Sequence, residues 1–155
     1  MDEKVKRMNI HLILHTAKLL EQFQRKAFAP YGILPAQGRV LSVLLVNGAV
    51  HQNRIAKGLN LSPPTVTVML RTMEKKGLIR RYPSRENESA ISVELTQSGI
   101  LAAMEVHRAW DDMESKISNI LSEGGADELR EQLHKLRDGF GGKDPGITHK
   151  GIEFQ

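Results

Sequence analysis

Hydrophobic residues recur every three to four positions in four segments of the first half of the chain, which is the spacing of helices with one buried face. The pattern predicts helices over residues 5–28, 35–46, 52–59 and 63–76. The first is apolar on two adjoining stripes, an arc too wide for one small core, and this indicates additional burial by a second subunit. The fourth has Ser62 as its N-cap and exposes Val68, an aliphatic residue, on an otherwise polar face.

After Gly77 the period of the hydrophobic residues changes from about 3.6 to 2, which indicates strands. The pattern predicts strands at residues 78–82 and 91–95, followed by helices over residues 97–121 and 127–138. The charged loop 83–89 joins the strands into a hairpin, and Thr96 is placed to cap the helix that follows. The glycine-rich residues 139–155 are expected to form a flexible tail.

This order of elements predicts a mainly α chain with a small β-hairpin wing. A helix, a tight turn, a second helix with a polar outer face and a hairpin are the parts of a winged helix-turn-helix, which we place at residues 35–96. The terminal helices, in residues 1–34 and 97–138, are expected to form a helical dimerisation region, because their apolar seams need a partner helix.

The basic charge of the chain is concentrated in its middle. The net charge is +4, but residues 35–100 carry nine Lys and Arg against four Asp and Glu, a balance of +5. Residues 101–155 carry seven against eleven, a balance of −4. A basic middle region favours a polyanion such as double-stranded DNA as the partner, although a merely basic surface would give the same count.

Composition excludes several other kinds of site. The chain has no cysteine, so it has no disulfide, thiolate zinc site or thiol redox switch. No arrangement of residues suggests catalysis, and we expect neither an enzyme nor a cofactor. The sequence opens without a signal-peptide pattern and has no uncharged apolar run of membrane-spanning length, so we expect a cytoplasmic protein.

The predicted DNA contacts come from the helix over 63–76 and from the hairpin. A helix fits the major groove of B-DNA, and residues near its N-terminus reach the base edges. Short hydroxyl donors there suit a phosphate or a base edge, whereas Val68 suits the methyl group of thymine. The candidate contacts are Ser62, Pro63, Pro64, Thr65, Thr67, Val68, Arg71 and Lys75 in the helix and Arg80, Arg81, Arg85 and Asn87 in the hairpin.

Five segments occur in an order and spacing shared with a known family. They are LPAQ at 34–37, RIA at 54–56, LSPPTVT at 61–67, MEKKGLI at 73–79 and VELTQSG at 93–99. With these segments the chain resembles the MarR family of bacterial and archaeal transcriptional regulators over about residues 5–138. The resemblance implies a homodimer with intertwined terminal helices that binds a pseudo-palindromic operator, acts as a repressor and responds, like many relatives, to small molecules.

Two positions depart from the family pattern. Val68 stands where relatives often have arginine, and Asn87-Glu88-Ser89 stands where the wing usually has Asp-Arg-Arg. An acidic residue at the wing tip repels phosphate, and Arg85 is placed to substitute for the missing arginine. The departures motivate an alternative function, a dimeric protein-interaction or antagonist module without sequence-specific DNA binding. Five cations on the outer surface argue against it: Arg71, Lys75, Arg80, Arg81 and Arg85.

Two further groups of residues have two interpretations each, a binding site and ordinary packing between helices. His11 and His15 have the i, i+4 spacing of metal ligands, and His107 would add a third imidazole if the helices cross. A place at the edge of the dimer interface is the favoured interpretation, and no metal is predicted. The family geometry also implies a site for a small aromatic or anionic effector, although Trp110 is spaced as a core residue. The candidate effector residues are Leu14, Lys18, Arg39 and Trp110.

Overall fold

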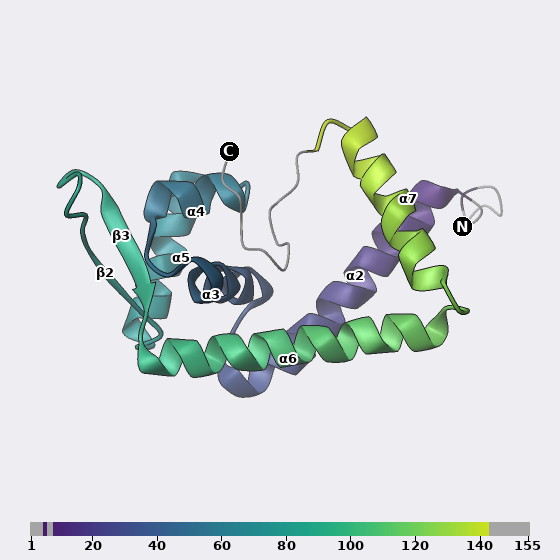
Figure 1. The fold of residues 1–155 in the computed structure, drawn as a ribbon, viewed down its shortest axis with the longest axis horizontal. Helices are drawn as coiled ribbons and strands as arrows, with labels where there is room; N and C mark the ends of the chain where they lie inside the picture. The colour runs from purple at the N-terminus through teal and green to yellow at the C-terminus, as the bar shows by residue number, and fades with distance from the viewer. Residues whose placement is uncertain (1–4, 6–7, 143–155) are drawn as a thin grey trace.

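Helix α6 (Gln97–Ile120) runs along the molecule, from the winged helix-turn-helix at its start to the other terminal helices at its far end (Figure 1). The computed structural model describes residues 5 and 8–142. The predicted fold class, mainly α with a small β wing, is confirmed. The other elements are α2 (Asn9–Phe28), η1 (Ala29–Tyr31), α3 (Pro35–Asn47), β1 (Val50–His51), α4 (Gln52–Gly58), α5 (Pro63–Lys75), β2 (Ile79–Pro83), β3 (Ile91–Leu95) and α7 (Gly125–Gly139).

The wing belongs to a three-stranded antiparallel sheet with the order β1-β3-β2. The sequence predicted the hairpin β2–β3 alone, because the two residues of β1 are too few to show an alternating pattern. Val50 pairs with Val93, and both are buried, while His51 pairs with Ser92. Strand β3 is therefore paired on both sides, and β1 ties the wing to the segment that leads into α4.

The hydrophobic core lies in the winged helix-turn-helix, among α3, α4, α5, the sheet and the first half of α6. On α5 the residues Val66, Leu70 and Met73 point inward as the spacing predicted, which leaves the opposite face of the helix to solvent. Ala56 is buried where α4 packs on α5. The largest fully buried side chains are Phe28, Val40, Leu41, Val43, Ile55, Val66, Leu70, Met73, Ile79, Val93 and Val106.

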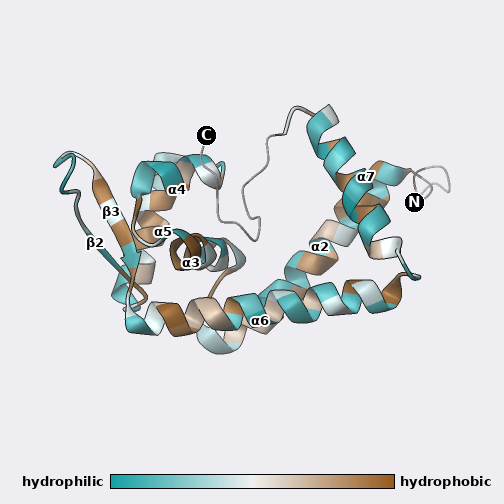
Figure 2. Cartoon of the chain, viewed as in Figure 1, coloured by the Kyte–Doolittle hydropathy of each residue, from teal (hydrophilic) through white to brown (hydrophobic). Residues whose placement is uncertain are grey.

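The terminal helices leave large hydrophobic side chains uncovered within one chain. Figure 2 shows hydrophobic residues on α2 and α7 as well as on the buried α3. The uncovered residues are Ile10, Leu12, Ile13, Leu14, Leu19, Leu20 and Phe23 on α2 and Leu129, Leu133 and Leu136 on α7. No single described helix is long and apolar enough to cross a membrane, although α2–η1 and α3 meet that test together as a pair bent by 71°. An exposed apolar surface of this extent is typical of an interaction site.

Several observed boundaries differ from the predicted ones. Strand β2 starts one residue later than expected, because Leu78 N–H donates to the carbonyl of Met73 and closes the end of α5. Helix α7 starts two residues earlier, after Gly124, which takes a left-handed φ of 76°. Of the predicted flexible tail, residues 143–155 lie outside the described part of the chain.

Candidate nucleic-acid interface

Helix α5 starts at an exposed turn that is held by side-chain hydrogen bonds. Asn60 takes a φ of 52° in the turn after α4, and Ser62 accepts a hydrogen bond of 3.3 Å from the N–H of Thr65. The hydroxyls of Ser62 and Thr65 are 2.7 Å apart. Pro63 and Pro64 occupy the first turn, where a missing N–H costs nothing. The predicted N-cap is confirmed, and all four residues from Ser62 to Thr65 are exposed.

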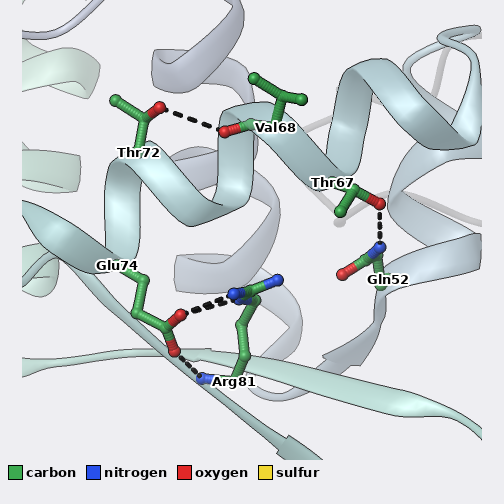
Figure 3. A network of polar contacts seen from close by, with 6 residues as sticks. All are labelled: Gln52, Thr67, Val68, Thr72, Glu74 and Arg81. Carbon is green, nitrogen blue, oxygen red and sulfur yellow. Dashed lines mark hydrogen bonds and ion pairs between the residues drawn. The ribbon is translucent and has the colours of Figure 1, made fainter.

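In the middle of α5 the threonine hydroxyls are used inside the protein (Figure 3). Thr67 Oγ1 donates to the carbonyl of Pro63 at 2.9 Å and accepts from Gln52 Nε2 at 2.8 Å. Thr72 Oγ1 donates to the carbonyl of Val68 at 3.1 Å. Because a hydroxyl has one hydrogen, neither threonine donates to a partner without breaking its internal bond. Gln52, which sequence reasoning missed, lies in the first turn of α4 and orients Thr67.

Three other side chains of α5 are available to a partner. Val68 is 64% exposed on the outer face. Arg71 and Lys75 are also exposed, and neither forms an ion pair with another described residue. The spacing of Val68, Arg71 and Lys75 places them along one face of the helix. The outer face of α5 therefore presents an aliphatic group followed by two cations.

Arg81, a predicted DNA contact, is bound to the end of α5 (Figure 3). Its guanidinium donates to Glu74 Oε2 from Nε at 3.0 Å and from a terminal nitrogen at 2.7 Å, and its backbone N–H donates to Oε1 at 3.1 Å. These charge-assisted bonds lower the pKa of Glu74. The Arg81 side chain is only 20% exposed. A contact between Arg81 and DNA would require this pair to open, so that contact stays a prediction.

Arg80 and Tyr82 share a carboxylate on the neighbouring strand. Arg80 forms an ion pair with Glu94, and the Tyr82 hydroxyl donates to Glu94 Oε2 at 3.0 Å. The second bond raises the pKa of Tyr82, because the hydrogen is held by an ionised acceptor. The Arg80 side chain remains 70% exposed, so it is accessible to a phosphate on the outer side of the wing.

The wing tip is shaped by short polar side chains. Asn87 Oδ1 accepts from the N–H of Ser89 at 3.1 Å and from its hydroxyl at 2.6 Å. Ser84 Oγ lies 3.1 Å from His51 Nε2, which connects the loop to β1. Arg85 is exposed between these two anchors and forms no ion pair with another described residue. Asn87, a predicted DNA contact, therefore organises the loop that carries Arg85.

A hollow with a positive lining lies between the wing and the start of α4. Four arginines and two glutamates contribute to it: Arg54, Arg80, Arg81, Arg85, Glu86 and Glu94. His51 lines the hollow as well. Neither His51 nor Arg54 was among the predicted DNA contacts, although Arg54 could have been found in the sequence as a basic residue in the first helix of the helix-turn-helix. The excess of positive charge suits an anion such as a phosphate.

Comparisons with known proteins agree on one family. The MarR family model matches residues 33–88, which contain α3, α4, α5 and β2. The HTH-type transcriptional repressor MdtR of Bacillus subtilis is 30% identical over 89 residues, and the HTH-type transcriptional regulator MgrA of Staphylococcus aureus is 28% identical over 118 residues. The winged helix-turn-helix of this chain is therefore similar to that of the MarR family.

The extent of the similarity differs among these relatives. The alignments cover 57% and 76% of this chain, and the chain spans 54% of the length of MdtR and 79% of that of MgrA. MepR of S. aureus, solved as a complex with DNA, has the same fold with a TM-score of 0.78 and 28% identity, covering 86% of this chain and 98% of MepR. The MarR family comprises transcriptional regulators rather than enzymes, as expected from the sequence.

The three histidines considered for a metal site do not come together in this chain. The rings of His11 and His15 lie 6.1 Å apart on α2. His107 Nε2 instead lies 2.8 Å from Ser42 Oγ, and its ring stacks on Trp110. In the part of the chain that the structure describes, no group of three His, Cys, Asp or Glu residues is placed to hold a metal ion.

The residues suggested for an effector lie on three neighbouring helices. Trp110 on α6 is partly buried, with its ring centroid 6.3 Å from that of Phe28 and 5.7 Å from that of His107. Leu14 and Lys18 on α2 and Arg39 on α3 are exposed. The contacts of Trp110 favour its role in packing, and the effector site stays a prediction.

Proposed function

We propose that this protein is a homodimeric, sequence-specific DNA-binding regulator of the MarR family that acts as a repressor of transcription. The observation that carries the proposal is the outer face of α5, where Val68, Arg71 and Lys75 are exposed while the opposite face packs into the core. An α-helix fits the major groove of B-DNA, and a rigid core beneath the helix sets its orientation.

The surroundings of α5 support a DNA partner. MepR was solved with DNA, and MdtR is named a repressor. The exposed Arg80 and Arg85 of the wing supply cations that suit contacts with the neighbouring DNA backbone. The positive lining of the hollow beside α4 favours further phosphate contacts, which contribute affinity without sequence preference.

The terminal helices support a homodimer. Their uncovered apolar faces would be buried by a second copy, and a two-fold axis would present two copies of α5 to the DNA. Two such helices bind DNA half-sites that lie about one turn of the DNA double helix apart, so the expected operator is a pseudo-palindrome.

A small aromatic or anionic effector is part of the proposal. Trp110 supplies an aromatic ring on α6, and Lys18 and Arg39 supply exposed cations on α2 and α3, which both pack against α6. An effector bound among these helices would change DNA affinity by favouring one spacing of the two α5 helices over another. With chromosomal DNA as its proposed partner, the protein is also proposed to act in the cytoplasm.

Selection of duplex DNA from a random library by the purified protein tests the proposal. We expect an enriched inverted repeat at near-physiological salt. Binding without enrichment would reduce the interaction to sequence-independent attraction to phosphate and contradict the proposal. An absence of binding would favour the dimeric protein-interaction or antagonist module instead.

Arg71→Ala tests the base-contacting role of α5. We expect the variant to bind the selected operator more weakly by about 1–3 kcal/mol and to lose the sequence preference at one position of each half-site. Competition binding with single-base operator variants measures both effects. Arg130→Ala removes the same charge from α7 and should leave the preference unchanged. An equal loss of affinity for every sequence would make Arg71 a phosphate contact.

A further inference from the structure

The centre of the outer face of α5 offers a DNA partner apolar groups rather than hydroxyl donors. Thr67 and Thr72 donate their hydroxyl hydrogens to carbonyls of the preceding helical turn, and Gln52 additionally donates to Thr67 (Figure 3). Val68 lies between them on the chain and is 64% exposed. The branched methyl groups of Val68 are therefore the accessible surface at this point of the helix.

The exposure of Val68 has no explanation in the fold of one chain. The core takes Val66, Leu70 and Met73 from α5, and Val68 lies on the opposite face. A β-branched residue at an exposed helical position loses side-chain freedom without gaining burial. Unlike the uncovered residues of α2 and α7, Val68 lies on α5, within the winged helix-turn-helix.

We propose that Val68 contacts the 5-methyl group of a thymine in each half-site of the operator. This inference rests on the proposed function and specifies which base the helix recognises. Thymine is the one standard base that presents a methyl group in the major groove. Arg71 lies one helical turn beyond Val68 on the same face and carries the donors for a neighbouring base, so an aliphatic contact and a charged contact act side by side.

Gln52 has a positioning role in this arrangement. Gln52 lies in the first turn of α4, and its Nε2 donates a hydrogen bond to Thr67 Oγ1 at 2.8 Å. Thr67 directly precedes Val68 in the sequence. The bond joins α4 to α5, the two helices of the helix-turn-helix. It keeps the Thr67 hydroxyl engaged within the protein and holds the turn of α5 that carries Val68.

Uracil, which differs from thymine only by the missing methyl group, is the probe. In the operator selected from the random library, thymines are replaced by uracil at one symmetric pair of positions at a time, and binding is measured for the wild-type protein and Val68→Ala. Removal of one buried methyl group is expected to cost about fourfold in affinity for each half-site and about 15-fold for both. The wild-type protein should show this loss at one pair of positions, and Val68→Ala should show less than about twofold there.

Val46→Ala is the matched control, because Val46 is an exposed valine at the end of α3. This variant should keep the wild-type dependence on the methyl group. The inference is overturned if uracil is tolerated at every position by the wild-type protein, or if Val68→Ala keeps the full dependence. A library that yields no enriched sequence overturns the proposed function and this inference together, whereas an operator without a Val68-dependent thymine overturns this inference alone.

Discussion

Gly99 is the residue at which two backbone segments approach too closely for any side chain. A Cβ atom built at this position would lie 1.9 Å from the carbonyl oxygen of Leu78. Thr96 holds the same corner, since its hydroxyl donates to the carbonyl of Gly77 at 2.6 Å and accepts from the N–H of Gly99 at 3.0 Å. The corner sets the angle between the wing and α6, because β3 leads into it and α6 leaves from it.

Gly99→Ala is expected to destabilise the fold by about 1–3 kcal/mol, because the backbone of Leu78 or of α6 must move to admit the methyl group. Denaturant unfolding measures the change. Gly139→Ala makes the same chemical change where nothing lies within 4 Å, and its stability should differ little from that of the wild type. Equal unfolding midpoints for the two variants would show that the corner relaxes without cost.

Single residues differ in how far the sequence predicts their roles. The caps Ser62 and Thr96 were predicted correctly, because capping depends on residues three positions apart. The partner of Arg81 was not predicted, since Glu74 lies seven residues earlier across a change from helix to strand. Likewise Gln52 reaches Thr67 only because α4 and α5 cross, and such long-range contacts have no periodic pattern in the sequence.

At the scale of elements, the pair Glu74–Arg81 joins the end of α5 to β2 and sets the position of the wing beside the helix. Glu74→Gln removes the charge of the acceptor, and we expect weaker operator binding because the wing is held less firmly. Glu88→Gln makes the same charge change at the wing tip and should bind DNA slightly more tightly, since a repulsive charge is lost. Tighter binding by Glu74→Gln would instead favour the predicted contact between Arg81 and DNA.

The same pair gives a pH dependence of stability. The pKa of Glu74 is lowered from the ordinary value of 4.5, so the pair stabilises the folded state fully above that value. Its contribution is lost as the pH falls through the lowered pKa and the carboxylate is protonated. The stability difference between the wild type and Glu74→Gln, about 1 kcal/mol or less near neutral pH, should therefore shrink below about pH 4. Thermal unfolding across this pH range measures it.

At the scale of the whole molecule, the sequence predicted the segments that form the core and a first helix whose apolar surface one small core does not cover. Residues with helical spacing in α3 and α5 are buried, whereas the equally apolar stripe of α2 is exposed in one chain. Periodicity alone does not distinguish these cases, because it reports an apolar face and not what covers it. The width of the arc on α2 was the informative feature, since one small core needs a narrower stripe.

The dimer is testable by a charge placed on an uncovered apolar face. Leu133 on α7 is 47% exposed in one chain, so Leu133→Glu is compatible with the fold of that chain but would bury a carboxylate in the proposed interface. Light scattering over a range of concentrations should give a dimer for the wild type and a shift toward the monomer for the variant, with circular dichroism reporting the helical content. Val46→Glu, on the exposed end of α3, should remain dimeric. A monomeric wild type would contradict the homodimer, and an unchanged dimer of Leu133→Glu would place its interface away from α7.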